Sequence, residues 1–288
     1  MRWSSGNRGN IEDARGRSGG GMRGGASLGV GGLLVLLVLS WATGTDFLSL
    51  LGGVDSGSPS SAVTGTTTAE VQTTPEEERM VDFVDAVAGD TQDTWQRLLG
   101  NDYQRTRVVL FRDATQSGCG AAESATGPFY CPSDQKVYLD LGFFAELGQR
   151  FGAPGDFAQA YVIAHEFGHH VQSLLGTNER VRAGSMGADS ASVALELQAD
   201  CYAGIWGHDA SQGGRFQAGK VELEPGDADE ALRAASVIGD DHLQKMSTGR
   251  VQPERFTHGT SAQRMEWFQR GMKTGDPRQC DTFSQLTP

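Results

Sequence analysis

The sequence lacks an excess of positive charge. Its 288 residues include 24 Lys and Arg against 36 Asp and Glu, so the formal net charge is −12. This balance argues against a nucleic-acid-binding protein, which needs a basic face to neutralise phosphates. Cysteines are also scarce, because there are only four and none forms a C-x-x-C pair. That absence argues against a zinc finger built from cysteines, and no internal repeat is visible.

A second absence lies near the N-terminus, where no Lys or Arg occurs between Gly24 and Pro75. Residues 1–25 are rich in Gly, Ser and Arg, and we expect a disordered tail there. Residues 26–48 are expected to form a transmembrane signal-anchor, since residues 26–45 carry no charge over about the length of a bilayer-spanning helix. The alternatives are a buried helix or a cleaved signal peptide, although no small-x-small cleavage site is clear. The preceding arginines predict a single-pass membrane protein with a cytoplasmic N-terminus and an extracytoplasmic catalytic domain.

The folded domain is expected to cover residues 75–288. Residues 49–74 are rich in Gly, Ser and Thr and show no hydrophobic period, which is typical of a flexible linker. Thr74, Pro75 and the three glutamates that follow predict a helix start. They supply a cap, a proline at the first helical position and acidic groups at the positive end of the dipole.

The order of elements in this domain predicts an α+β fold, with strands first and helices after them. Strands are expected at residues 106–112 and 136–140, and helices at 156–175, 190–206, 227–243 and 260–272. A capping box, formed by Thr260 and Gln263, opens the last helix. Residues 136–140 could be an edge strand that binds an extended peptide, or an ordinary core strand.

The stretch VIAHEFGHHVQ, residues 162–172, carries the chemistry. His165 and His169 are four residues apart, so a helix places both on one face, where they can bind one Zn²⁺ ion. Glu166 can act as the general base, as in the H-E-x-x-H motif of metalloproteases. His170 is turned about 100° away from His169 and is left out of the site. The alternative is a buried helix whose histidines are only hydrogen-bonded.

A catalytic zinc takes three protein ligands. Gln172 stands where the longer motif H-E-x-x-H-x-x-G-x-x-H requires glycine, so a third histidine from this helix is excluded. We expect the third ligand to be Glu196, on a later helix. Asp200 lies on the same face and is expected to hold the N–H group of a ligating histidine, His165. Two acidic residues of the intervening connection are the alternatives: Glu179 and Asp189.

Four stretches of the chain resemble the neutral zinc metallopeptidases of bacteria: GPFYCPSDQKVYLDL, AHEFGHHVQ, ELQADCYAGIW and FTHGTSAQRMEWFQRG. The resemblance covers nearly the whole chain apart from the linker. It implies a mostly helical, zincin-like domain with a small β-sheet after an N-terminal transmembrane helix. It also implies a gluzincin-type site, with His165, His169 and Glu196 on one zinc ion and Glu166 as the base.

Peptide hydrolysis at such a site needs a further group that stabilises the oxyanion. His258 is the preferred catalytic candidate, because it stands on a loop just before a capped helix and can project into a cleft. Membrane CAAX-type proteases carry a comparable late histidine and arginine. Three further residues are alternatives for this role: His242, Tyr202 and Arg264.

The four cysteines are expected to form two disulfides, provided that the domain lies in an oxidising space. Cys119 and Cys131 flank a short Gly-rich loop, and a bridge between them stabilises the domain by around 3 kcal/mol. Cys201 and Cys280 then form the second pair, which ties the C-terminal tail to the helix of Glu196.

We therefore expect a membrane-anchored zinc peptidase that acts on peptide or protein substrates, with one zinc ion per chain. The alternatives are a non-catalytic, zinc-stabilised envelope binding module and a cell-wall amidase. Glu166 favours an enzyme, because a purely structural zinc does not need a base beside it. The sequence does not specify the substrate or the oligomeric state.

Overall fold

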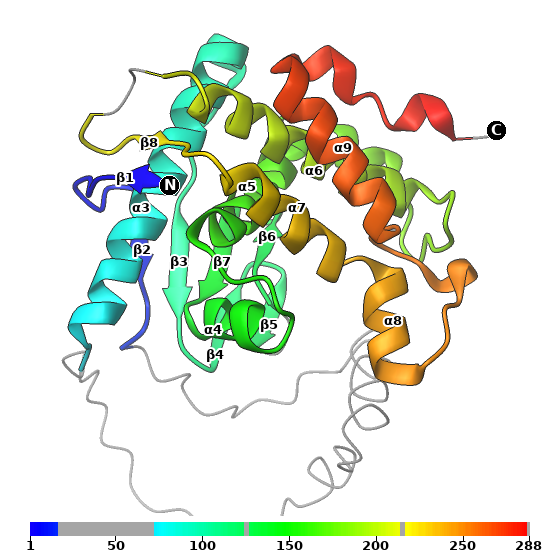
Figure 1. Ribbon diagram of the computed structural model, residues 1–288, viewed down its shortest axis with the longest axis horizontal. Helices are drawn as coiled ribbons and strands as arrows, with labels where there is room; N and C mark the ends of the chain where they lie inside the picture. Colours follow the sequence, from blue (N-terminus) through cyan, green and yellow to red (C-terminus); the bar gives the residue numbers. More distant parts are fainter. Residues whose placement is uncertain (17–71, 124–126, 214–216, 287–288) are drawn as a thin grey trace, which may run out of the picture.

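The structure is a computed structural model that describes residues 1–16, 72–123, 127–213 and 217–286. The expected transmembrane segment, residues 26–48, lies outside these residues, as does all but the end of the expected linker. No helix within the described ranges is both long enough and apolar enough to span a bilayer. Helices and small sheets combine in one domain, which confirms the α+β class (Figure 1).

The largest sheet has four strands in the order β2-β3-β7-β6. Strands β2 and β7 run parallel to β3, whereas β6 runs antiparallel to β7. Strand β7 is therefore an interior strand and β6 is an edge, so residues 136–140 are the core strand rather than the peptide-binding edge. The strands of this sheet are β2 (Ile11–Asp13), β3 (Val108–Phe111), β6 (Phe129–Cys131) and β7 (Lys136–Asp140). Two-stranded sheets pair β4 (Ala114–Ser117) with β5 (Gly120–Glu123), and β1 (Arg2–Trp3) with β8 (Val221–Glu222).

The expected helices begin where the sequence signals placed them, but the structure adds α4, which the sequence analysis did not predict, and it divides one expected helix into two. Thr74 caps α3 by accepting a hydrogen bond from the Glu77 amide, and Thr260 and Gln263 form the expected capping box of α9. The single helix expected over residues 227–243 is wrong, because two helices replace it. The backbone leaves the helical conformation at Gly239, whose ψ is 146°, and a side chain there would collide with the backbone of Ser261. The α-helices are α3 (Pro75–Leu99), α4 (Gly142–Gln149), α5 (Asp156–Leu174), α6 (Ala191–Ala210), α7 (Asp227–Val237), α8 (Asp240–Thr248) and α9 (Ser261–Thr274). Short 3₁₀ helices cover Gly100–Asp102, Thr177–Arg180, Pro253–Arg255, Pro277–Cys280 and Phe283–Gln285.

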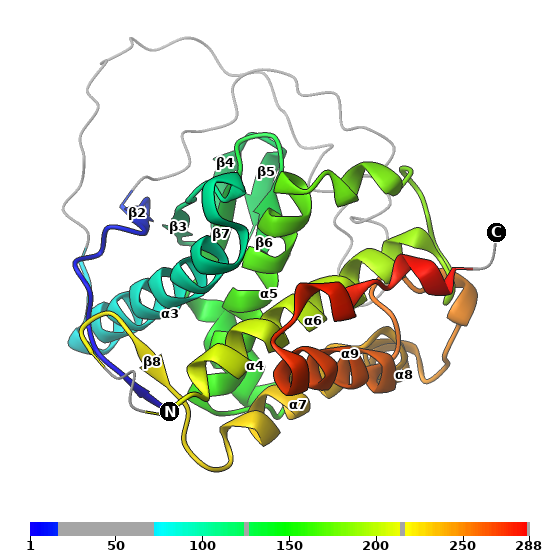
Figure 2. The ribbon, with the colours of Figure 1, turned by 90° about the horizontal axis from the view of Figure 1, so that it is seen from above.

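Helix α5 lies at the centre of the domain (Figures 1 and 2). It packs against α3 and the sheet on one side and against α6 on the other, and α9 packs on α6. The approach of α5 to α6 is close because Gly168 has no side chain, since a Cβ atom there would lie 3.0 Å from the Ala199 carbonyl oxygen. Gly271 of α9 meets the backbone of Cys201 in α6 in the same way. Helices α5, α6 and α9 are thereby held at short separation.

Residues 1–16 are part of this fold, so the expected disordered tail is wrong for them. Strand β2 is hydrogen-bonded along β3, and the Ala14 amide donates to the Leu110 carbonyl at 2.8 Å. The side chain of Arg15 is buried and pairs with Asp13 and Glu78 at 2.6 and 2.9 Å. Composition alone predicted disorder because this segment has few apolar residues. Hydrogen bonds and ion pairs to the rest of the domain hold it instead.

Both expected disulfides are present. Cys119 and Cys131 are joined across the loop that precedes β6, with an S–S distance of 2.04 Å. Cys201 of α6 is joined to Cys280 in the C-terminal segment, with an S–S distance of 1.98 Å. The four cysteines therefore include no free thiol.

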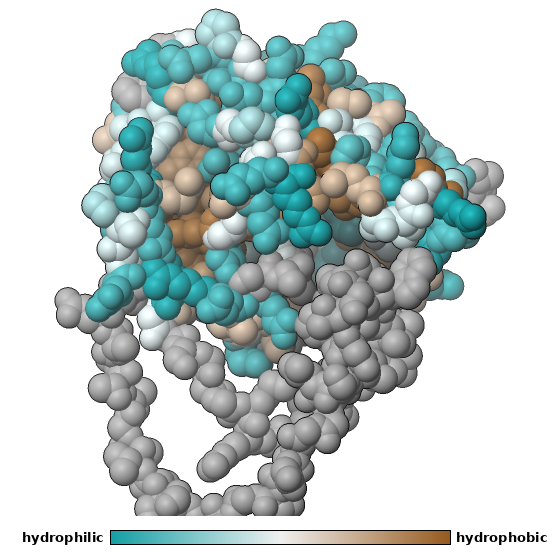
Figure 3. Space-filling model, turned by 60° about the horizontal axis from the view of Figure 1, so that its bottom comes forward, coloured by the Kyte–Doolittle hydropathy of each residue, from teal (hydrophilic) through white to brown (hydrophobic). Residues whose placement is uncertain are grey.

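The surface that Figure 3 brings forward is mainly hydrophilic, and hydrophobic residues occupy separate patches on it. The large hydrophobic side chains that are exposed in the described part of the chain come from different elements: Leu98, Leu175, Met186, Met246 and Val251. Scattered exposure of this kind is normal for a folded domain and does not by itself mark an interaction surface.

Candidate metal centre and active site

Three expected metal ligands come together between α5 and α6. The Nε2 atom of His165 lies 3.2 Å from one carboxylate oxygen of Glu196, and the Nε2 atom of His169 lies 3.5 Å from the other. All three side chains offer a ligand atom within 4.8 Å of the others. The two alternatives for the third ligand, Glu179 and Asp189, are exposed and do not belong to this group.

The geometry of this group fits a zinc ion. Ligand atoms at about 2.0–2.1 Å from a tetrahedral zinc are roughly 3.3 Å from one another, close to the two distances between the imidazoles and Glu196. Two imidazole nitrogens and a carboxylate are also a donor set that zinc prefers, and they leave a fourth position for water or substrate. The residues of this chain therefore suit the metal.

Asp200 lies where the sequence placed it, against His165. One oxygen of its carboxylate accepts a hydrogen bond from the Nδ1 atom of His165 at 2.8 Å, which leaves Nε2 for the metal. The same carboxylate binds the guanidinium of Arg264 through Nε at 2.8 Å and Nη2 at 2.9 Å. The hydroxyl of Tyr161 also donates to it. Arg264 thus neutralises Asp200, and this use of its guanidinium argues against a role on the oxyanion.

His169 has a different partner, which the sequence analysis missed. Its Nδ1 atom donates a hydrogen bond to the side-chain oxygen of Gln172 at 2.8 Å. This bond leaves the Nε2 atom of His169 to face Glu196. The signal was in the sequence, because Gln172 is three residues after His169 and so lies on the same side of the helix.

Charges around the buried ligands shift their pKa values in a consistent way. Burial alone would raise the pKa of Asp200, but Arg264 and His165 outweigh it and lower the pKa to about 2. Burial would lower the pKa of His165, but Asp200 and Glu196 outweigh it and raise the pKa to about 10. The pKa of Glu196 is held well below its usual value by His169 and His258 against the effect of burial. The carboxylates are thus ionised and attract a cation.

Glu166 is buried beside the two histidines, and it lines the same cleft as they do. Burial raises the pKa of its carboxyl group, while the charges of His169 and His165 and the backbone amide of Tyr130 act in the opposite direction. A raised pKa brings a carboxylate closer to neutral pH, which is where a general base or acid works best.

The cleft has a volume of about 620 Å³ and opens in front of the ligands. Edge strand β6 contributes Phe129 and Tyr130 to its wall, and α4 with the turn after it contributes Phe143 and Phe151. His258 lies on the opposite side. The cleft therefore combines aromatic walls with a polar, charged floor, as enzyme sites generally do.

His258 is held in this cleft by Asp240, a residue that the sequence analysis did not assign to the site. One oxygen of Asp240 accepts hydrogen bonds from the backbone amides of Thr257, His258 and Gly259 at 2.7, 2.6 and 3.0 Å. The Nδ1 atom of His258 lies 3.3 Å from the other oxygen. Burial lowers the pKa of His258, but Glu196 and Asp240 outweigh it and raise the pKa, which favours the cation.

The other two candidates for stabilising the oxyanion, Tyr202 and His242, lie outside the cleft. Tyr202 is buried in a separate cluster against Trp95, with ring centroids 4.9 Å apart, and His242 does not line the cleft. His170 points away from the metal ligands, as expected. Its Nε2 atom donates to the Gln104 carbonyl at 2.6 Å, and its Nδ1 atom lies 3.2 Å from the Tyr130 hydroxyl.

Comparisons with known proteins identify a family for this chain. The sequence profile of the family described as "Putative neutral zinc metallopeptidase" matches residues 1–283. The chain is similar to the uncharacterized protein YpfJ of Escherichia coli (strain K12), with 45% identity over 300 residues and 99% of each chain covered. It is also similar to the uncharacterized protein Rv2575 of Mycobacterium tuberculosis, with 49% identity over 194 residues and 66% of each chain covered. No solved structure matches the chain.

Proposed function

Since this chain belongs to the neutral zinc metallopeptidase family, we propose that it hydrolyses peptide bonds in peptide or protein substrates. The observation that carries the proposal is the convergence of His165, His169 and Glu196 next to Glu166. A non-catalytic zinc module or a structural site would not need a buried carboxylate beside the ligands. We infer one zinc ion per chain, because one such group of two histidines and a carboxylate is found among the described residues.

The roles of the protein groups follow from their positions. A zinc ion held by the three ligands supplies a Lewis acid that activates water and polarises a carbonyl group. Glu166 takes a proton from the attacking water and later delivers it to the leaving amine. Asp200 and Gln172 keep the two imidazoles in the tautomer that presents Nε2. Asp240 holds His258 at the cleft, where its imidazolium donates a hydrogen bond to the developing oxyanion.

Strand β6 supports the binding of an extended peptide. It pairs with β7 on one side only, and within the described part of the chain no strand pairs with its other side. A peptide can therefore extend the sheet through main-chain hydrogen bonds, with its side chains against the aromatic walls. This arrangement would place the scissile bond near Glu166, since Tyr130 of β6 contacts that residue through its backbone amide.

Removal of the metal is expected to abolish hydrolysis. The purified chain, incubated with an unfolded protein substrate, should produce fragments, and an excess of a chelator should stop this. Addition of zinc after removal of the chelator should restore the activity, because the ligands are held in place by Asp200 and Gln172. Metal analysis should find about one zinc ion per chain. Fragmentation that persists in the zinc-free protein, or a purified chain that binds no zinc, would exclude the proposal.

His258→Phe is expected to lower kcat by a factor on the order of 10²–10³, the usual effect of losing one oxyanion donor. Zinc content should not change, because His258 is not one of the converging ligands. His242→Phe is the matched control, since it changes the same residue type outside the cleft and should leave kcat near that of the unsubstituted enzyme. Equal activities of the two variants would remove His258 from the mechanism.

We also propose that the domain lies in an extracytoplasmic space, held at a membrane by residues 26–48. Two disulfides support the location, because such bonds persist in oxidising compartments. The proposal differs from the sequence expectation in two linked respects, namely the side of the N-terminus and the single crossing of the membrane. A chain that crossed the membrane once between β2 and β3 would separate two paired strands. We therefore propose that residues 1–16 lie on the same side of the membrane as the catalytic domain, and that residues 26–48 insert into the membrane without crossing it once.

This arrangement predicts a specific cross-link. Glu12 of β2 and Lys136 of β7 form an ion pair at 2.7 Å. A chain with Glu12→Cys and Lys136→Cys should be cross-linked internally by a short bis-maleimide in intact bacterial cells, and mass spectrometry of its peptides should detect the link. The control pair combines Glu12→Cys with Lys245→Cys on the distant helix α8, and should give no link. A cross-link that forms only after the membranes are dissolved would favour an N-terminus on the opposite side.

A further inference from the structure

Gln172 and Gln198, called here the glutamine pair, are two amide side chains buried between α5 and α6. Gln172 is 0% exposed and Gln198 is 7% exposed. Burial of an amide is costly unless its donors and acceptors find partners. The partners of these two side chains therefore show what the pair does.

The glutamine pair forms a directed chain of hydrogen bonds that starts at the metal ligand His169. The side-chain oxygen of Gln172 accepts from His169, and its nitrogen donates to the carbonyl of Leu195 at 2.7 Å and to the side-chain oxygen of Gln198 at 3.1 Å. The nitrogen of Gln198 donates to the carbonyl of Cys280 at 2.9 Å. Each amide thus has a single consistent orientation, with oxygen toward His169 and nitrogen toward Cys280.

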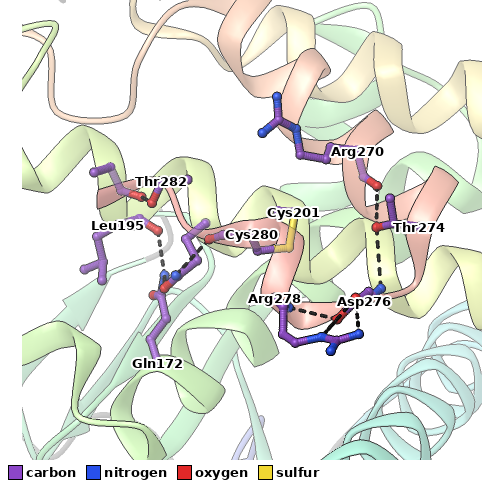
Figure 4. Close-up of a disulfide and its surroundings, with 11 residues drawn as sticks. Gln172, Leu195, Cys201, Arg270, Thr274, Asp276, Arg278, Cys280 and Thr282 are labelled. Carbon is purple, nitrogen blue, oxygen red and sulfur yellow. Dashed lines mark hydrogen bonds and ion pairs between the residues drawn. A yellow bond between two sulfur atoms is a disulfide. The ribbon is translucent and has the colours of Figure 1, made fainter. Parts of the chain in front are cut away.

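The chain ends at the second disulfide (Figure 4). Figure 4 shows Gln172 reaching toward Leu195, and the tail at Cys280 beside Cys201. The tail has a further bond to the same helix, since Thr282 donates to the Ala194 carbonyl at 2.6 Å. The Cys201–Cys280 bridge therefore secures the carbonyl group on which the glutamine pair ends.

Gln172 also connects the two halves of the metal site. One end of its amide orients His169 on α5, and the other end binds the carbonyl of Leu195, the residue just before Glu196 on α6. A shift of α6 relative to α5 would break the second bond and move Glu196 away from the histidines. Asp200 of α6 likewise orients His165 of α5, by accepting a hydrogen bond from its Nδ1 atom.

We propose that Gln172 is a positioning residue for the zinc ligand His169, and that the disulfide-tethered tail supports it through Gln198. This inference rests on the proposed zinc site. Zinc affinity then depends on the attachment of a C-terminal segment that lies outside the cleft. Partners that orient a ligating histidine typically contribute 10- to 100-fold to metal affinity.

The test measures the zinc dissociation constant of the full chain by competition with a chromogenic chelator. Gln172→Leu is expected to weaken zinc binding by roughly 10- to 100-fold, and Gln198→Leu by less, because Gln198 does not touch a ligand. Circular dichroism verifies that each variant is folded. If Gln172→Leu does not fold, Gln198→Leu decides the question alone. A dissociation constant unchanged in every folded variant of the pair would overturn the inference.

The disulfides supply a matched control. Replacing Cys201 and Cys280 by serine should weaken zinc binding, whereas the same change at Cys119 and Cys131 should not. In the Gln172→Leu background, loss of the Cys201–Cys280 bridge should not weaken zinc binding further, because the hydrogen bonds that link His169 to Gln198 are already lost. Equal effects of the two disulfide losses, or fully additive effects with Gln172→Leu, would contradict the role of the tail. An unsubstituted chain that binds no zinc would instead refute the proposed function.

Discussion

Glu166→Gln is expected to reduce peptide hydrolysis by at least about 10²- to 10⁴-fold, the usual contribution of a general base. The amide has the size and shape of the carboxylate but cannot accept the proton of the attacking water. Zinc should still bind, because Glu166 is not one of the three converging ligands. The measurements are the rate of cleavage of an unfolded protein and the zinc content of the purified variant.

Glu179→Gln is the matched control for this experiment. It makes the same chemical change at an exposed glutamate in the connection between α5 and α6, and we expect nearly unchanged activity and zinc content. The control also tests an alternative third ligand that the sequence left open. Retention of full activity by Glu166→Gln would assign the zinc site to a binding or structural role.

Arg264→Met is expected to lower the free energy of unfolding by about 3–5 kcal/mol, the usual result of removing one partner of a buried ion pair. Arg264 is 3% exposed and Asp200 is fully buried, so the variant leaves the carboxylate without its counter-ion. Urea unfolding followed by circular dichroism measures the change. Combining Arg264→Met with Asp200→Asn should recover part of the loss, because neither charge is then left unpaired.

The control for this variant lies two turns away on the same helix. Arg270 is partly exposed and pairs with Glu266 at 3.2 Å, so Arg270→Met should cost no more than about 1 kcal/mol. If Arg264→Met and Arg270→Met lowered the free energy of unfolding by similar amounts, Arg264 and Asp200 would not be coupled as the structure indicates.

The pH at which the protein unfolds in acid should also depend on the ion pair between Arg264 and Asp200. The pKa of Asp200 in the folded protein is about 2, below its ordinary value of 3.8. Its ionised form therefore contributes stability at neutral pH, and this contribution is lost only as the pH falls from about 4 toward 2. Without Arg264 the folded pKa rises, so the variant should unfold at a higher pH than the unsubstituted protein.

Local patterns in the sequence were reliable wherever one element was enough to determine the outcome. The spacing of His165 and His169 placed both rings on one face, and the starts of α3 and α9 followed from their caps. The disulfide pairing also followed, since the short separation of Cys119 and Cys131 left Cys201 and Cys280 as the other pair. Glu196 and Asp200 were found because helical spacing links them to each other.

Long-range partners were missed because no local period encodes them. Asp240 is 18 residues from His258 and was expected inside a single helix over residues 227–243, yet the break at Gly239 brings it under the loop of His258. Strand β2 has too few apolar residues for its composition to suggest a strand. It pairs with β3, which lies about a hundred positions further along the chain. The sequence left open whether residues 136–140 form an edge or a core strand, and β6, the true edge, was not expected because it is only three residues long.

The sequence by itself determined the reactive groups of this protein: two imidazoles and a base on one helix, and two carboxylates on another. Helical periodicity is a property of the backbone, so spacing alone sets which side chains share a face. Only the tertiary structure decided what completes the site, namely Arg264 on Asp200, Asp240 on His258 and the N-terminal strand in the sheet. Those contacts depend on how closely whole helices approach, and small residues such as Gly168 and Gly271 set that approach through packing rather than through any pattern along the chain.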